Sequence, residues 1–141
     1  MFNKIKIGEG TEVDAFLRGR KRGLIISENA FKTEQRLKNF YFHEKEYISG
    51  NIFVGVFHRK HDMEFFRDSA KSYCDIGRIL GYPPKAYKKF ENTFDRSFSE
   101  KLILDYFGVQ FVCLKEDYED CLKWLKINAK PRSYRRRYEY A

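Results

Sequence analysis

The chain has 141 residues, of which 43% are hydrophobic and 34% are charged, and its formal net charge is +8. This length suits one domain with its own core, and charges of both signs indicate a soluble surface. No apolar run approaches the roughly 20 residues of a membrane-spanning helix, which argues against a membrane partner. The three cysteines lack CxxC spacing, which argues against a disulfide framework and a structural zinc site. We therefore expect a cytoplasmic protein with reduced thiols.

Near the N-terminus, capping and glycine signals predict a short helix followed by a loop. Thr11 and Asp14 have the spacing of a capping box, so a helix is expected to begin there and run toward Arg18. Gly19 and Gly23 then bracket a basic segment that reads as a loop. The elements predicted after it are a strand over 24–27, a helix capped by Asn29 over 30–39, an ambiguous segment over 40–48, a buried central strand over 52–57, helices over 61–70, over 73–80 and from 83, a helix over 100–107, a strand over 109–114 and a helix opened by Asp117.

This order of elements predicts an α+β fold, with a small mixed β-sheet packed by about five helices. Pro131 ends the last periodic pattern. We therefore expect a single α+β domain over 1–130 and a basic, flexible C-terminal tail over 131–141.

The net charge is concentrated in two short segments. Arg18, Arg20, Lys21 and Arg22 form the first, and residues 130–139 form the second, so the rest of the chain is close to neutral. A localised basic surface is what a polyanion partner requires, and arginines interleaved with tyrosines both neutralise phosphates and stack on unpaired bases. The residues predicted to bind nucleic acid are Arg20, Lys21, Arg22, Arg132, Tyr134, Arg135, Arg136, Arg137 and Tyr138.

The leading functional hypothesis is a nucleic-acid-associated protein that binds the phosphates of RNA or DNA weakly, through its two basic clusters and in a salt-sensitive way. Two alternatives stay open. The first is a small enzyme, or a binder of an anionic metabolite or nucleotide, and the second is a viral or cellular interaction module that docks onto a protein partner or a second copy of itself. No catalytic residue is assigned, and whether the protein is an enzyme is left open.

The enzyme alternative depends on a candidate pocket. Ser27 and His58 end two predicted strands, where helix starts attract anions, and Tyr82 could offer a ring beside the planar donor of Arg78. The candidate pocket residues are Ser27, His58, His61, Arg78 and Tyr82. Each also has a simpler structural explanation, as a helix cap, a solvated helix start or a helix stop. The histidine pair lacks a third ligand and no phosphate-binding glycine pattern occurs, so neither a metal nor a cofactor is predicted.

Residues 77–83 read Gly-Arg-Ile-Leu-Gly-Tyr-Pro, with Phe90 seven residues further on. This pattern resembles the Gly-x-x-Leu-Gly-Tyr-Pro signature of a largely archaeal family of unknown function, and the resemblance extends to 19–23, to the strand and helix from Leu24, and to 50–55. In that family a cysteine pair typically follows the proline, whereas Lys85 and Ala86 stand there in this chain. The resemblance implies an α+β fold and an archaeal or archaeal-virus source, without thiol or metal chemistry at this turn. It implies no activity.

Overall fold

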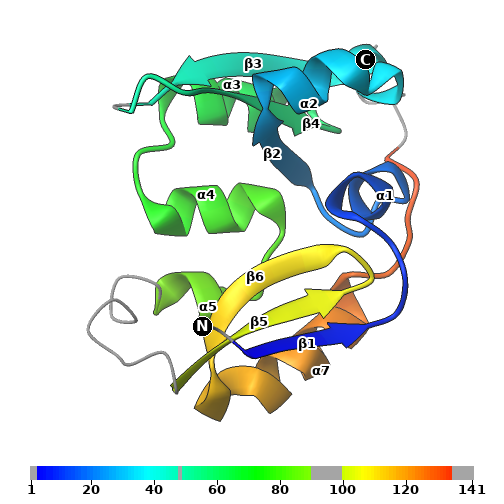
Figure 1. Ribbon diagram of the computed structural model, residues 1–141, viewed down its shortest axis with the longest axis vertical. Coiled ribbons are helices and arrows are strands. Elements are labelled where there is room, and N and C mark those ends of the chain that lie inside the picture. Colours follow the sequence, from blue (N-terminus) through cyan, green and yellow to red (C-terminus); the bar gives the residue numbers. More distant parts are fainter. Residues whose placement is uncertain (1–2, 48, 90–99, 135–141) are drawn as a thin grey trace.

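Two three-stranded sheets lie one above the other along the long axis of the molecule, with helices on and between them (Figure 1). The computed structural model describes residues 3–47, 49–89 and 100–134. The predicted α+β class is confirmed. The single mixed sheet is not found, because its strands divide between two sheets that do not share an edge.

The upper sheet has the strand order β2–β4–β3 and is antiparallel throughout. Its strands are β2 (Gly23–Ser27), β4 (Ile52–Phe57) and β3 (Tyr41–Glu46). The predicted central strand is confirmed, since β4 pairs on both edges and its last four residues are buried. Helices cover the apolar side chains on both faces of this sheet, which gives two hydrophobic clusters. Phe31 of α2 (Glu28–Thr33) and Leu37 of the 3₁₀ helix η1 (Gln35–Asn39) belong to one cluster. Phe66 of α3 (Lys60–Asp68) belongs to the other.

The lower sheet has the order β1–β5–β6. Here β1 (Asn3–Ile7) runs parallel to β5 (Lys101–Tyr106), and β6 (Val109–Leu114) returns antiparallel to it. The 3₁₀ helix η3 (Lys115–Asp117), α5 (Pro84–Lys88) and α7 (Tyr118–Asn128) complete this half of the molecule. The prediction of a helix over 100–107 is wrong, because this segment forms the central strand of the sheet and is paired on both sides.

Two helices lie between the sheets and join them into one unit (Figure 1). In α1 (Glu12–Leu17), Ala15 packs in the core of the lower sheet and its neighbour Phe16 packs in the core of the upper one. The predicted capping box is confirmed at its N-terminus, where Thr11 and Asp14 exchange hydrogen bonds. The second helix, α4 (Tyr73–Leu80), ends at Gly81 with φ of +84°, as its sequence predicts.

The helix predicted over 30–39 is wrong at both ends, because extended backbone at Glu34 separates α2 from η1 and α2 begins earlier than predicted. The side chain of Ser27, rather than Asn29, accepts the capping hydrogen bond from the backbone N–H of Ala30, at 3.2 Å. Both residue types cap helices well, so the hydrophobic pattern alone does not select between them. Across the described ranges, none of the helices combines the length and the apolar character that crossing a bilayer requires.

Candidate functional site

The first basic segment and the start of the second meet beside α1. The chain leaves α7 and runs along α1 (Figure 1), and Tyr134 then contacts His58, which follows β4. The backbone N–H of Arg132 donates to the carbonyl oxygen of Arg18 at 3.0 Å, and the Arg20 guanidinium donates to the carbonyl oxygen of Ala129 at 3.1 Å. Gly19 permits this approach, because a Cβ atom there would lie 1.9 Å from the carbonyl oxygen of Arg132. Residues from opposite ends of the chain thus share one surface.

A stack of three rings holds this segment against the upper sheet. The His58 imidazole lies between Phe16 and Tyr134, with ring centres 4.1 Å and 4.2 Å away and interplanar angles of 24° and 10°. The Nε2 atom of His58 is 2.7 Å from the carbonyl oxygen of Phe16. A carbonyl oxygen can only accept, so we assign the proton to Nε2. The stack fixes Tyr134, and with it the direction of the chain after Arg132.

Two guanidinium groups lie over the ring of Tyr134. The Cζ atoms of Arg59 and Arg132 are 5.2 Å and 5.8 Å from the ring centre. Burial raises the pKa of the Tyr134 phenol, while the positive charges of Arg132, Arg59 and Arg22 act in the opposite direction. The structure therefore gathers basic side chains from the first loop, from the start of α3 and from the C-terminal segment around one tyrosine.

One carboxylate lies beneath these arginines. Asp62 is 3% exposed, and its Oδ1 atom accepts a hydrogen bond from Nη2 of Arg22 at 2.8 Å, with Nε2 of the exposed His61 3.5 Å away. The other carboxylate oxygen, Oδ2, and the Nε atom of Arg22 are buried and have no hydrogen-bond partner among the described residues. Of the three arginines, Asp62 therefore forms an ion pair with Arg22 and, among the described contacts, with neither Arg59 nor Arg132.

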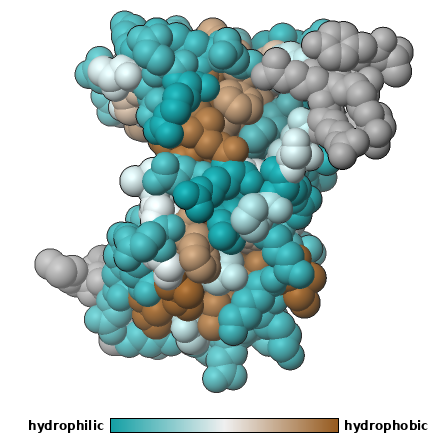
Figure 2. All heavy atoms as spheres, turned by 90° about the vertical axis from the view of Figure 1, so that its right-hand side faces the viewer, coloured by the Kyte–Doolittle hydropathy of each residue, from teal (hydrophilic) through white to brown (hydrophobic). Residues whose placement is uncertain are grey.

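We call Arg18, Arg22, Arg59 and Arg132 the arginine surface. No carboxylate of the described residues forms an ion pair with Arg59 or Arg132, and both side chains are exposed, as is that of Arg18. Figure 2 faces the side of the molecule that carries α1 and the C-terminal segment, and hydrophilic residues cover the middle of that side. The resulting surface carries an excess of positive charge that solvent can reach.

Lys21 does not belong to this surface, so the prediction that it contacts nucleic acid is wrong. Its side chain is 1% exposed, and its Nζ atom lies 5.1 Å from the centre of the Tyr82 ring. The backbone of Lys21 and Arg22 packs against Gly81, where a Cβ would lie 3.1 Å from the Arg22 nitrogen. This packing turns the Lys21 side chain inward, and charge counting along a sequence carries no information about that direction.

Two further predicted contact residues have structural partners. The Arg20 guanidinium lies 4.2 Å above the ring of Phe107 while it donates to Ala129, so it anchors the C-terminal segment. One face of Tyr134 is covered by His58, which leaves that face unable to stack on a base. The remaining predicted contacts, Arg135, Arg136, Arg137 and Tyr138, lie outside the described residues.

The predicted pocket is also wrong, because its residues lie apart. Strands β2 and β4 are antiparallel, with Gly23 opposite Phe57 and Ser27 opposite Phe53. Ser27 and His58 are therefore at opposite ends of the ladder, about 15 Å apart at 3.3 Å per residue. The Arg78 guanidinium lies 5.0 Å above the ring of Phe65, on the side of α4 that faces α3, whereas Tyr82 lines a pocket against the lower sheet.

The sequence did not predict that Arg59 belongs to this surface or that Asp62 pairs with Arg22. Both follow the apolar strand β4, and a basic residue there reads as an ordinary solvated helix start. Their importance comes from Arg22 and Tyr134, which approach them from distant parts of the chain. In the described ranges, no group of three histidine, cysteine or acidic side chains converges as a metal site would need.

Fold and site together define an α+β protein with a localised arginine surface built from both ends of the chain. No protein-family model matches this chain, and no curated protein or solved structure matches it either. The resemblance of residues 77–83 to the Gly-x-x-Leu-Gly-Tyr-Pro family stays a prediction.

Proposed function

We propose that this protein binds the phosphate backbone of a nucleic acid, RNA or DNA, at the arginine surface. The observation that carries the proposal is the hydrogen bond from Arg132 to Arg18, because it brings together two basic segments that the sequence keeps far apart. Arg59 adds a third source of positive charge at the same place. A surface that unites charges in this way attracts a polyanion more strongly than the same charges spread over the molecule.

The chemistry of the side chains also favours phosphate. A guanidinium group presents several donors in a plane and binds phosphate oxygens bidentately, which an ammonium group cannot do. His58 covers one face of Tyr134, and the guanidinium groups of Arg59 and Arg132 lie over its ring, so the proposal does not depend on base stacking by this tyrosine. The proposal is therefore contact with the backbone, weak and largely independent of base sequence.

The test is the affinity of labelled single-stranded RNA and duplex DNA, measured by fluorescence anisotropy over a series of salt concentrations. We expect affinity to fall steeply with salt. A variant with Arg59→Gln and Arg132→Gln should bind more weakly, and its log–log salt slope should be shallower by about 1.4 to 1.8, since each lost phosphate contact removes about 0.7 to 0.9.

The matched control is a variant with Arg67→Gln and Lys88→Gln. It loses the same two charges at exposed positions outside the arginine surface, near the end of α3 and on α5. It should retain the affinity and slope of the original protein. Equal losses in the two double variants, or no binding at low salt, would contradict the proposal.

A further inference from the structure

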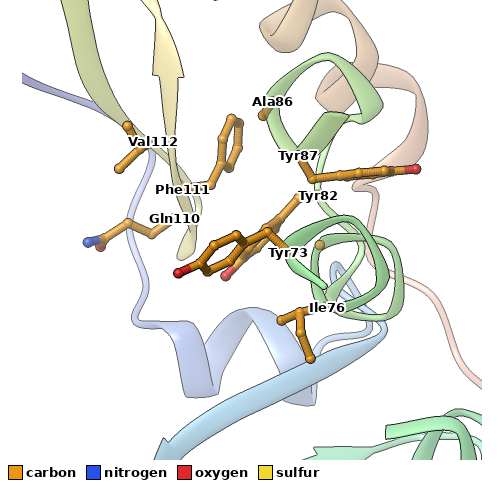
Figure 3. A pocket seen from close by; sticks show the side chains of 9 residues that line it. Tyr73, Ile76, Tyr82, Ala86, Tyr87, Gln110, Phe111 and Val112 are labelled. Atoms are coloured by element: carbon orange, nitrogen blue, oxygen red, sulfur yellow. The ribbon is translucent and has the colours of Figure 1, made fainter. Parts of the chain in front are cut away.

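We propose that a second site, which shares no residue with the arginine surface, accepts a flat heteroaromatic ring of the nucleobase class. The site is a pocket between α4, α5 and β6 (Figure 3). Its walls are mainly aromatic and aliphatic side chains: Tyr73, Ile76, Tyr82, Tyr87, Phe111 and Val112. This proposal does not depend on phosphate binding.

The volume of the pocket limits the occupant to one ring system. The hollow measures about 210 Å³. An apolar cavity of about 150 Å³ is enough to admit a benzene ring, so this hollow can accept a single ring system and is too small for a folded peptide element or a duplex. Close packing of α4 against α5 shapes it, because a Cβ on Gly77 would lie 2.3 Å from the Cβ of Tyr87.

The arrangement of the rings favours a flat occupant with a polar edge. Tyr82 and Phe111 pack against each other with ring centres 5.5 Å apart and planes 34° apart. Figure 3 shows the rings of Tyr73 and Tyr82 near each other, with their hydroxyl groups at the same end. Aromatic walls stabilise a ring through its faces, and the hydroxyl group of Tyr82 can hydrogen-bond to its edge. A nucleobase has both a flat face and a polar edge.

The buried ammonium of Lys21 adds an electrostatic preference. Its Nζ atom lies 5.1 Å from the centre of the Tyr82 ring, one of the pocket walls, although Lys21 does not itself line the pocket. A positive charge beside this wall favours a ligand that places electron-rich oxygen or nitrogen atoms near it. Nucleobases carry such carbonyl and ring-nitrogen acceptors, whereas a cationic ring would be repelled.

The experiment uses adenosine and uridine, which carry no phosphate, with affinities measured by calorimetry and by chemical-shift changes. The side chain of Tyr73 is 52% exposed, so Tyr73→Ala should leave the fold intact while it removes one wall. We expect it to weaken nucleoside binding about tenfold or more, in line with the loss of one stacking partner. Val112→Phe should fill the hollow and abolish binding.

Tyr47→Ala is the matched control, because Tyr47 is 40% exposed and lies outside the pocket, just after β3. It should bind nucleosides as the original protein does. The proposal is overturned if neither nucleoside binds the original protein at millimolar concentration, or if Tyr47→Ala and Tyr73→Ala cause the same loss.

The two proposals fail separately. The Arg59→Gln and Arg132→Gln variant should still bind adenosine, and the Tyr73→Ala variant should keep the salt slope for RNA. Competition experiments also show which molecule supplies the ring. If single-stranded RNA displaces adenosine and duplex DNA does not, the natural ligand is an unpaired base. If neither nucleic acid displaces adenosine, the natural ligand is a free nucleoside or nucleotide.

Discussion

The backbone N–H of Arg132 donates a hydrogen bond to the carbonyl oxygen of Arg18, with 3.0 Å between nitrogen and oxygen. These residues come from opposite ends of the chain, so the arginine surface exists only in the folded protein. Binding that survived unfolding would reflect charge alone, whereas binding by this surface requires Gly19, the ring stack and the pair between Arg22 and Asp62. Each of these elements yields a prediction.

Gly19→Ala should displace the C-terminal segment. Gly19 has φ of +77°, and its Cβ would lie 1.9 Å from the carbonyl oxygen of Arg132. Gly50→Ala is the control, because Gly50 has φ of +84° with nothing within 4 Å of a Cβ. Both changes introduce backbone strain of about 1 kcal/mol. Only Gly19→Ala should lower the free energy of unfolding in urea by more than this amount and also weaken RNA binding. Equal effects of the two changes on RNA affinity would refute this role of Gly19.

Tyr134→Ala should loosen the same segment by removing the outer ring of the stack. An aromatic pair contributes about 0.5–1.5 kcal/mol beyond the burial of its area, so we expect a loss of about 1–3 kcal/mol in the free energy of unfolding. Tyr134→Phe keeps the ring and should retain both stability and RNA affinity. If Tyr134→Phe were as damaging as Tyr134→Ala, the hydroxyl rather than the stack would be responsible. Denaturant unfolding and anisotropy measure the two effects.

Arg22→Met should destabilise the fold, because it leaves the carboxylate of Asp62 buried without its guanidinium partner. Breaking a buried pair costs about 3–5 kcal/mol, and the partial exposure of Arg22 places the expected loss nearer 2–3 kcal/mol. Adding Asp62→Leu should restore most of this loss, since the unpaired charge is then gone. Additive losses in the double variant, seen by urea unfolding, would show that the pair is not coupled.

Glu34 should titrate far below an ordinary glutamate. A side-chain hydrogen bond from Arg36 lowers its pKa from 4.5 to about 2. Because the folded-state pKa is depressed, the contribution of Glu34 to stability is fully present above pH 4.5 and is lost as the pH falls through about 2. Carboxyl NMR titration measures this midpoint, and Arg36→Gln should move it back toward 4.5. A midpoint near 4.5 in the original protein would contradict the hydrogen bond.

The three thiols should differ in reactivity. Cys113 and Cys121 are at most 1% exposed, and a hydrogen bond with Cys121, together with burial, raises the pKa of the Cys113 thiol. Cys74 is partly exposed and donates to the carbonyl oxygen of Tyr87 at 3.5 Å. A thiol reagent should therefore modify one cysteine quickly and two only after unfolding. Cys74→Ser should abolish the fast phase, and a fast phase that persists would disprove the assignment.

Local signals in the sequence predicted local structure well. Thr11 and Asp14 mark the start of α1, and Gly81 marks the end of α4, because caps depend on residues a few positions apart. The buried centre of the upper sheet also followed from the continuous apolar run of β4.

Contacts between distant segments could not be predicted. The sequence predicts a helix for the segment that forms β5. Its buried Lys101 and Asp105 interrupt the apolar pattern of a strand, and the pairing with β1 and β6 that makes it a strand involves distant residues. Nothing local shows that Lys21 points inward or that Arg59 joins Arg22 and Arg132. The sequence indicated a basic surface, and the fold determines which basic residues form it.

Phosphate binding at the arginine surface is tested most directly by an NMR titration of the full chain with single-stranded RNA, recorded on the backbone amides and on the arginine Nε–H groups. We expect the chemical-shift changes to concentrate in residues 18–22, at Arg59 and in 129–134, and to disappear at high salt. Shifts confined to other surfaces, or none at low salt, would contradict this expectation.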